Sequence, residues 1–537
     1  MIYFENAPND LINKIESWKS IKRNWLDRAN HSMDLYLNDV DETGTTYSYN
    51  QVQVIKANTN IPVSINYLYP VVAQKMAIIL ASKPSHKVIS LDERAKQHAY
   101  ILDKVKHAIM YSSEATTENE EAIKEMLVSG IGHIGIVEKD LYNLGEFEIS
   151  YQHFSYNNIT IDPNSRKKNN ADMEGYVYEK ELNEDQIKFL YSDIIEQFNV
   201  YYGTEHTYEE LLSASTSLPY NSLENIANRR KAIVRKYYDK VASVMYYVQD
   251  PATNDIQRLF KENYFPEQIE ILFDNQFIKG QEPNFYVREM TIVGDKILEV
   301  RILPLTIFPI KTLYFEWGGK PYRSYGMVHY TQGMQEAMDK SLQLMILNGI
   351  LTNNSGWIAP KGSIAEEDRV KWEQAGNDPR VIKEYNPVIV DNGVLRPERE
   401  QIGQLSSFYP NIMEIMQRGI ENSTGINPIL QGDPRGSKVD VFSSLQAYQN
   451  AGMQRINMTI SSINNAMETV GKILIQYILS NLKPNINYQF FNDKGKIDEI
   501  KISQEIMANL RTKNFDVLAV PSESSPTQKL NMAIEMM

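Results

Sequence analysis

A glycine-rich hexapeptide is the segment of the chain whose spacing comes nearest to a chemical motif. Residues Gly130-Ile131-Gly132-His133-Ile134-Gly135 match the pattern G-x-G-x-x-G. This pattern binds dinucleotide phosphates when it follows a strand and opens a helix. Here it follows a stretch of helical periodicity and precedes one of strand-like alternation, which is the reverse order. We interpret the glycines as a helix stop and a strand entry where the backbone passes close to neighbouring chain. A nucleotide-binding enzyme that uses Gly130–Gly135 is kept only as a third alternative.

Other residue patterns that serve catalysis or metal binding do not occur in the sequence. The 537 residues include no cysteine, which excludes disulfides, iron–sulfur clusters and cysteine nucleophiles. There is no P-loop and no H-E-x-x-H motif, and the eight histidines do not pair at i, i+4. We interpret the acidic run Glu366–Asp368 and the basic run Arg166–Lys168 as solvated surface. The sequence predicts no enzyme, no cofactor and no metal site.

Length and charge narrow the classes of protein further. A chain of 537 residues is expected to form several domains. Its composition, with 42% hydrophobic and 23% charged residues, is typical of a globular protein. The formal net charge of -13 argues against a protein that grips nucleic acid through a broad basic surface. It does not exclude a surface past which DNA slides. The N-terminus has no signal-peptide pattern and no apolar run is long enough for a bilayer, so we expect a soluble protein made inside the cell.

The first 320 residues alternate between the periodicities of helices and strands. Spacing typical of amphipathic or buried helices covers about 11–37, 65–81, 93–129 and 182–198, while strand-like stretches cover 131–162, 233–248 and 285–303. Val293-Gly294-Asp295-Lys296 fits a tight hairpin turn, since glycine can adopt a positive φ there. These elements predict a mixed fold of the α+β class.

Two helices of low charge flank a highly charged segment in the C-terminal half. Residues 324–352 read as a helix with only three charged residues, and helical periodicity returns at 410–421. Between them, 361–401 carries nine acids and seven bases, several Pro and Gly residues and a short apolar strand at 388–390. We expect this segment to project from the helical pair. A projecting polar tip suits partner docking, and helices of low charge suit packing against neighbours.

The loop 425–438, GINPILQGDPRGSK, leads into the stretch with the most regular periodicity in the chain. Within the helix predicted at 441–482, apolar residues follow steps of four and three: Ile456, Ile460, Ile463, Met467, Val470, Leu474 and Tyr477. Such a seam is typical of a helix that packs against another helix. We favour packing inside the subunit, and a seam between subunits stays open. A β segment at 486–502 and a helix at 527–537 complete the prediction.

Several short segments, taken in order, resemble the portal proteins of tailed double-stranded DNA phages, most closely those of short-tailed phages. The resemblance covers roughly residues 10–525. It is carried by these stretches: Ile65–Val72 with Ala81–Pro84, Ser129–Gly132 before a strand, Asn158–Ser165 with Ala171-Asp172, Gly326–Asn348 with Gln335 and Ser341, and Ser423–Ile426 with Gln431-Gly432.

The resemblance implies a portal fold with an α/β wing, a helical stem, a small β-containing clip, a tunnel loop and a long wing helix. The implied parts are the N-terminal wing 1–323, stem helix 324–352, clip 353–405, stem helix 406–424, tunnel loop 425–440, wing helix 441–482, and the rest of the wing with the start of a crown at 483–537. Because the chain stops as its last helix begins, either the crown is minimal or absent, or the polypeptide has been cut short.

The resemblance also implies a function. Portal proteins form a ring of twelve subunits at one capsid vertex, the channel for genome packaging and ejection. The ring binds capsid and scaffold proteins, the terminase large subunit and then head–tail adaptors, and it lets duplex DNA pass without reading its sequence. We expect location in the virion after assembly in the host cytoplasm, and no membrane. The alternative is another virion head–tail adaptor or tail-ring protein, which would be shorter and lack stem helices around a clip.

Two sets of residues are candidates for the functional contacts of such a ring. The tunnel loop carries Asp433, Arg435 and Lys438, which would form rings of charge around the bore and meet passing phosphates weakly. The clip carries Trp372, Arg380 and Tyr385, and aromatic and Arg side chains dominate protein interfaces. We predict DNA contacts for the first set and partner docking for the second.

Overall fold

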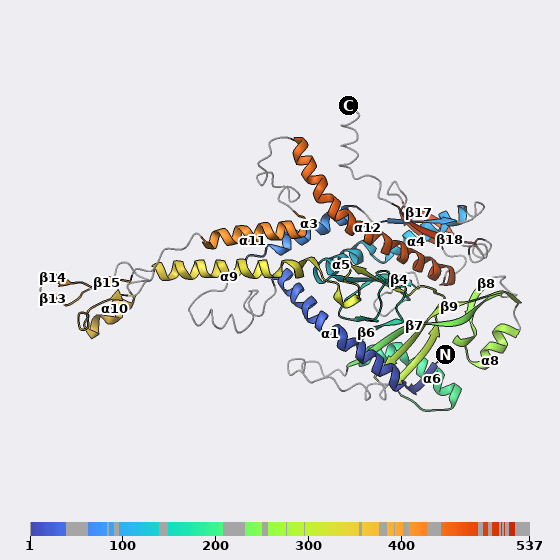
Figure 1. The fold of residues 1–537 in the computed structure, drawn as a ribbon. Coiled ribbons are helices and arrows are strands. Elements are labelled where there is room, and N and C mark those ends of the chain that lie inside the picture. The colour runs from blue at the N-terminus through green and yellow to red at the C-terminus, as the bar shows by residue number, and fades with distance from the viewer. Residues whose placement is uncertain are drawn as a thin grey trace. The chain divides into compact units, whose positions relative to one another are not determined.

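The fold is taken from a computed structural model of the chain and divides into two compact units (Figure 1). Unit 1 comprises Met1–Ser32, Val72–His329 and Arg435–Met537, and unit 2 comprises Met33–Val71 and Tyr330–Pro434. Residues Met33–Val71 thus group with Tyr330–Pro434 and not with the residues next to them in the sequence. The structure describes residues 2–38, 63–82, 85–90, 96–138, 149–207, 231–249, 256–274, 277–294, 296–353, 357–374, 384–390, 393–400, 408–426, 442–481, 487–491, 497–503, 506, 510 and 515–520.

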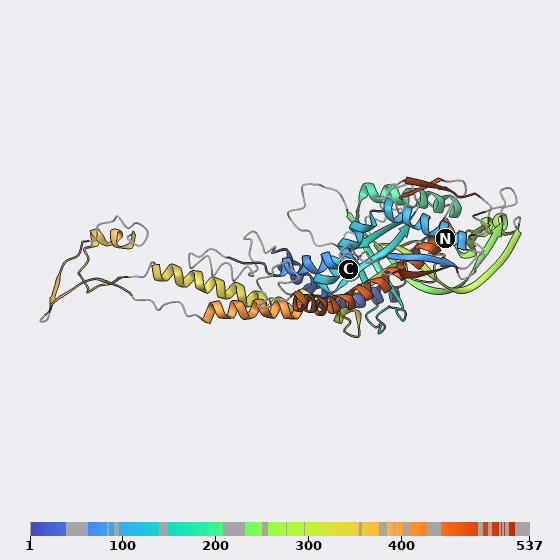
Figure 2. The ribbon, with the colours of Figure 1, turned by 90° about the horizontal axis from the view of Figure 1, so that it is seen from above.

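Unit 1 is built on a seven-stranded antiparallel sheet of order β1-β10-β9-β7-β6-β5, with β8 paired to β7. The strands β7 and β9, drawn in green, are long and curved (Figures 1 and 2). Gly294, at a φ of 60°, makes the predicted hairpin between β9 and β10. The bounds are β1 Ile2–Asn6, β5 Ile159–Ile161, β6 Gly175–Asn183, β7 Lys231–Gln249, β8 Ile256–Phe260, β9 Phe277–Val293 and β10 Lys296–Ile302.

Two helices cover this sheet because each has an apolar stripe to bury. Helix α1 (Asn9–Leu37) packs Ile15 and Trp18 against Tyr237 of β7. Helix α6 (Glu184–Tyr202) packs a second apolar cluster on the sheet and begins with a reciprocal cap, in which the Asn183 side chain accepts from Gln186 N at 2.9 Å. Both helices lie within about four residues of the predicted bounds.

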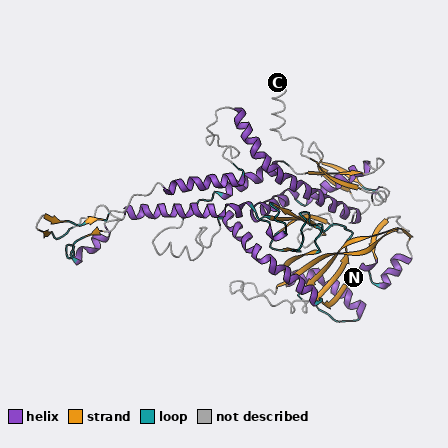
Figure 3. Cartoon of the chain, in the orientation of Figure 1, coloured by secondary structure: helices purple, strands orange, loops and turns teal. Residues whose placement is uncertain are grey.

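A smaller sheet of order β11-β3-β4 forms the second layer of unit 1. Its strands are β3 Ile131–Glu138, β4 Ile149–Phe154 and β11 Ile310–Tyr314, and helices α4 Lys96–Ser112, α5 Ala115–Ser129 and α12 Phe442–Asn481 pack around it. Unit 1 also contains two antiparallel two-stranded sheets (Figure 3). They are β2 Ser85–Ser90 with β18 Phe515–Val520, and β16 Asn487–Phe491 with β17 Ile497–Lys501.

The regular apolar seam of α12 faces the interior of unit 1. Six of its residues are at most 2% exposed, and Ile460 is half-buried. The six are Ile456, Ile463, Met467, Val470, Leu474 and Tyr477. The whole of α12 contacts mainly strands β11, β18 and β2, with α4 as a smaller neighbour. Within unit 1 its main partners are therefore strands, because the face of a sheet also accepts a narrow helical stripe.

The single helix predicted at 93–129 is two helices, α4 and α5. The chain turns at Glu114, which has a φ of 50° in the left-handed region. The Ser113 hydroxyl accepts a hydrogen bond from Tyr151 N of β4 at 3.1 Å. This contact comes from a residue far along the chain, so helical periodicity alone did not reveal the break. The end of α5 at Gly130 was predicted correctly, with a φ of 101°.

Unit 2 contains two long helices and a small tip. From Tyr330 onward α9 (Met327–Asn353) belongs to this unit, as do α11 (Phe408–Thr424) and the start of α3 (Leu68–Ala81). The predicted strand 388–390 is present, whereas helix α10 was not anticipated. The tip consists of β12 Trp357–Ile358, α10 Arg369–Gln374, β13 Val388–Val390, β14 Gly393–Leu395 and β15 Glu398–Arg399.

Candidate assembly and docking surfaces

Three polar side chains on one face of α9 hold an extended segment of unit 2 by its backbone. Gln335, Asp339 and Gln343 recur every four residues, so they lie on one face of the helix, and all are at most 8% exposed. Gln335 Nε2 donates to Ile65 O at 2.7 Å, and Tyr67 N donates to Gln335 Oε1 at 3.1 Å. Ile65 N donates to Asp339 Oδ1 at 3.2 Å. We call these three side chains the backbone clamp.

Asp339 is the centre of the backbone clamp. Its carboxylate also accepts from Ser64 Oγ at 3.1 Å and from Gln335 Nε2 at 3.1 Å. An isolated buried carboxylate is costly, but one that accepts several hydrogen bonds is stabilising and specific in geometry. The clamp therefore explains why three polar side chains of α9 are buried.

Replacing Asp339 with Ala should lower the free energy of unfolding of unit 2 by about 2–3 kcal/mol, because hydrogen bonds to a charged acceptor are lost and buried donors are left unpaired. Urea unfolding followed by tryptophan fluorescence measures this, since unit 2 contains Trp357 and Trp372. The matched control is Glu336→Ala, an exposed acid on the same helix, with an expected change within about 0.5 kcal/mol. Equal effects of the two variants would contradict the role of the clamp.

The two long helices of unit 2 leave much apolar surface uncovered. In α9 the run Leu342–Leu347 holds five apolar residues that are only half-buried. In α11 only Ile420 and Thr424 are buried, while Phe408 and Ile415 are 60% and 61% exposed. Contiguous exposed apolar surface marks interaction sites in soluble proteins. These faces are therefore suited to burial against other protein.

The tip has a small core around two tryptophans. The rings of Trp357 and Trp372 meet edge to face at 4.8 Å, and the Arg399 guanidinium lies 5.3 Å from the Trp357 ring centre. Trp372 Nε1 donates to Glu384 O at 2.8 Å. Trp372 is only 6% exposed, so it is part of the core of the tip and does not present itself to a partner.

Other residues of the tip are better placed for docking. Tyr385 is 36% exposed, whereas Arg380 lies outside the described residues. Ile358, Val370 and Ile389 are 63%, 56% and 80% exposed. These three residues were not among the candidates from sequence, although isolated apolar residues in a highly charged segment were a usable signal. The described tip thus offers apolar contacts surrounded by charge, as protein interfaces do.

The glycines of the G-x-G-x-x-G pattern are enclosed by the protein's own backbone. A Cβ on Gly132 would lie 2.1 Å from Ala122 O, and one on Gly135 would lie 2.7 Å from Pro309 O. Gly130 is held against Tyr325 in the same way. The motif follows α5 and enters β3, so no helix N-terminus follows it directly. The space that a phosphate needs is filled, which argues against the nucleotide-binding alternative.

A buried charge network joins four strands in unit 1, β3, β7, β9 and β10. Glu289 is 3% exposed, and its Oε1 lies 2.9 Å from Arg301 Nε and 3.5 Å from Lys236 Nζ. Burial alone would raise the pKa of Glu289, but the charges of Arg301 and Lys236 outweigh it and lower the pKa to about 2. Arg301 also pairs with Glu138. With every charge paired, the network is structural rather than a source of a catalytic acid.

The remaining predicted site residues fall outside the part of the chain that the structure describes. They are Asp433, Arg435 and Lys438 of the predicted tunnel loop, and the helix predicted at 527–537 lies outside it as well. In the described part of the chain, no group of three or more His, Asp or Glu side chains is arranged to hold a metal ion. None of the described helices is long and apolar enough to cross a membrane.

Comparison with known proteins agrees with this architecture. The family described as phage P22-like portal protein matches residues 14–537, nearly the whole chain. No curated protein matches. Portal proteins are structural components of the bacteriophage virion, associated with the capsid and with other head and tail proteins. The helical pair and its tip in unit 2 and the α/β unit 1 agree with that assignment, and the chain belongs to the P22-like phage portal protein family.

Proposed function

We propose that the protein assembles into a closed ring of about twelve copies that forms the channel for genome packaging and ejection at one capsid vertex. The observation that carries this proposal is the uncovered apolar surface of α9 and α11. In a ring with heterologous contacts each copy meets its two neighbours through two different surface patches, so two different helical faces can be buried at once. The net charge of -13 per copy suits a channel that repels phosphate and lets DNA slide.

Light scattering after size exclusion, with electron microscopy of the same fractions, tests the ring. We expect a species of about twelve chains of 61.9 kDa, or a ladder of rings, with an axial hole. Replacing Phe408 and Ile415 with Asp should shift the protein to monomers that keep their helical content. A wild-type protein that stays monomeric at all concentrations would refute the proposal. A ring without an axial hole would favour the alternative of a head–tail adaptor or tail-ring protein.

We place the docking of terminase, and later of head–tail adaptors, at the tip within 353–405. Tyr385 and Ile389 are its exposed contacts. Replacing Tyr385 with Ala and Ile389 with Asp should leave rings intact but weaken terminase and adaptor binding by about 1–2 kcal/mol per residue. The control is Glu366→Ala, whose side chain is 92% exposed. Trp372→Ala is not a clean test, because it removes part of the tip's core. Normal binding of both partners by the double variant would remove the tip as the docking site.

For the segment 425–440 we propose contact with DNA in the channel. Arg435 and Lys438 supply cations and Asp433 offsets them. Changing Arg435 and Lys438 to Glu should leave procapsid assembly normal and alter packaged DNA length or retention. Wild-type packaging and retention in that variant would exclude DNA contact by this segment. Loss of ring assembly would assign the segment a structural role.

A further inference from the structure

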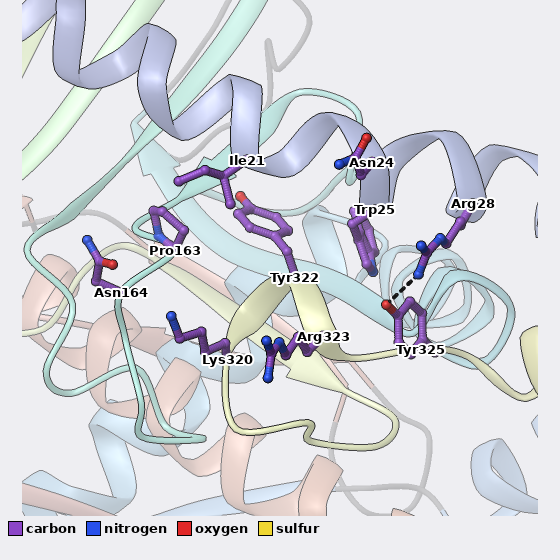
Figure 4. A pocket seen from close by; sticks show the side chains of 10 residues that line it. All are labelled: Ile21, Asn24, Trp25, Arg28, Pro163, Asn164, Lys320, Tyr322, Arg323 and Tyr325. Carbon is purple, nitrogen blue, oxygen red and sulfur yellow. Dashed lines mark hydrogen bonds between the residues drawn. The ribbon is translucent and has the colours of Figure 1, made fainter.

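A basic loop in unit 1 separates two surface pockets, each lined by cations and by no acid. The first pocket, of about 470 Å³, is formed by α1, the loop after β5 and the segment before α9 (Figure 4). Its cationic residues are Arg28, Lys320 and Arg323. In Figure 4, Arg28 descends from α1 and Lys320 and Arg323 come from the opposite side. Pro163 and Asn164 of the loop close the pocket at one edge.

The second pocket lies on the other side of the same loop. It has a volume of about 600 Å³, and its cationic residues are Lys167, Lys168 and Lys311. Small polar residues of α12 line part of its wall: Ser461, Ser462, Asn465 and Thr469. Residues of β11 and the apolar Met458 and Ala466 of α12 line another part. Asn164 and Lys167 are three peptide units apart, at most ~11 Å of extended chain. The two pockets and the basic run 166–168 therefore form one surface, which we call the basic saddle.

The loop of the basic saddle is held in a fixed shape by its own acids. The Asp172 carboxylate accepts from Ser165 Oγ at 2.8 Å, Arg166 N at 2.8 Å and Lys167 N at 3.2 Å. Asp162 accepts from the backbone N–H of Asn164 at 2.9 Å and of Glu174 at 3.1 Å. Both carboxylates thus bind mainly backbone and make no ion pair with the described basic side chains of the loop. The loop is rigid and its cations are displayed.

The cations of the basic saddle lack neutralising partners. Among the described residues, no carboxylate lies within 4 Å of the side-chain nitrogens of Arg166, Lys167, Lys168, Lys320 or Arg323. Arg28 donates to the Tyr325 hydroxyl at 2.8 Å, and Lys311 donates to Asn169 O at 2.7 Å. Of these seven cations without a described acidic partner, Lys311 is only 9% exposed and the other six are partly or fully exposed. In a chain of net charge -13, the six form a site for an external polyanion.

We propose that the basic saddle binds the phosphate backbone of duplex DNA without reading its sequence. Lys and Arg side chains together with Ser, Thr and Asn make most protein contacts to DNA phosphates, and both kinds line this surface. The saddle shares no residue with the segment 425–440. It is therefore a DNA contact in addition to the proposed channel loop, and either can fail while the other stands.

Two observations select duplex phosphate among the polyanions. Single strands are bound by stacking of bases on free aromatic rings, but here Trp25 is 3% exposed and the Tyr322 hydroxyl is bonded to Ile161 N at 2.7 Å. An acidic protein partner would need an apolar centre to the interface. The exposed loop residues between the pockets, at the centre of the surface, are Arg166, Lys167, Lys168 and Asn169, which supply none. Exposed apolar side chains, such as Ile21 and Met458, line the walls of the pockets on either side.

The test is fluorescence anisotropy of a labelled ~30-bp duplex with the purified full-length protein, over a series of salt concentrations from ~50 mM upward. The variant is Lys167→Glu with Lys168→Glu. The matched control is Lys87→Glu with Lys361→Glu, two exposed lysines outside the saddle with the same change of charge. Unfolding midpoints and ring assembly are measured for both variants.

We expect the saddle variant to raise Kd at ~50 mM salt at least tenfold more than the control. The salt slope should fall by about 1.8, because each lost phosphate contact removes about 0.9. Equal Kd and slope for variant and control would overturn the proposal. So would tighter binding of a single strand than of the duplex, or displacement of the duplex by polyglutamate of equal charge. Loss of ring assembly with unchanged DNA affinity would make the saddle an interface between copies, which also overturns it.

Discussion

Gly132→Ala is expected to prevent stable folding of unit 1. The added Cβ would lie 2.1 Å from Ala122 O and 3.2 Å from Met126 N, so the backbone of α5 must move away from β3. Backbone cannot give way as a flexible side chain does, and α5 supports the whole second layer of the unit. We expect a loss of more than about 4 kcal/mol. Thermal unfolding and the yield of soluble protein measure the effect.

Gly333→Ala is the matched control for this prediction. Gly333 lies within α9 with no heavy atom within 4 Å of the Cβ position. Alanine is favoured over glycine in a helix by up to ~1 kcal/mol, so this variant should be as stable as the wild type or more so. If Gly132→Ala unfolded at the wild-type temperature, the close packing of α5 on β3 would be disproved.

Glu289→Gln is expected to cost about 3 kcal/mol at pH 7 and to change how stability depends on pH. The pKa of Glu289 is about 2 in the folded protein against 4.5 for an unperturbed glutamate side chain, and each pKa unit corresponds to about 1.36 kcal/mol. Because the folded pKa is lowered, the stabilisation is complete above about pH 4.5 and is lost as pH falls from there toward 2.

Urea midpoints measured between pH 2 and pH 7 test this. The wild-type curve should fall through that acid range, and the Glu289→Gln curve should be flatter. Glu316→Gln, an exposed acid of the same unit, should reproduce the wild-type curve. A Glu289→Gln protein with the wild-type slope would show that other carboxyls account for the acid sensitivity.

Local periodicity predicted most of the individual elements. Helices α1, α6, α9, α11 and α12 and strands β7, β9 and β10 lie close to the expected ranges, because each has an apolar pattern that only one secondary structure can bury on one side. The hairpin at Gly294 was predictable for a different reason, since its positive φ is nearly confined to glycine.

Contacts between distant residues could not be predicted in this way. Strand β1 pairs with β10 some three hundred residues away, and β18 pairs with β2. Strands β1 and β18 are too short for their alternation of apolar and polar residues to be recognised in the sequence. The break at Glu114 likewise lies next to a contact between distant residues, the hydrogen bond from Tyr151 N to the Ser113 hydroxyl. Such features are set by tertiary packing, which a single sequence does not display.

The docking residues illustrate a limit of composition as a guide. Trp, Tyr and Arg are enriched at interfaces, and this favoured Trp372. The same side chain is also the largest available for a small core, and the tip uses it there, against Trp357. Large aromatic residues serve both in small cores and at interfaces, so only the exposure of each side chain in the folded chain separates Trp372 from Tyr385.

The backbone clamp has a consequence for how the sequence of this protein can drift. Gln335, Asp339 and Gln343 bind mainly the main chain of residues 63–67 rather than its apolar side chains. Substitutions at 63, 65 and 67 should therefore be widely tolerated in a saturation-mutagenesis library, except for proline, because these residues donate their N–H groups to the clamp. Substitutions at Ser64 and Asn66 should be tolerated less, because their side chains make hydrogen bonds to Asp339 and to the backbone of Tyr36, Leu68 and Tyr69. Gln335, Asp339 and Gln343 should tolerate few substitutions. The side chains at 63, 65 and 67 can therefore change during evolution while the three helix residues that bind their backbone stay the same.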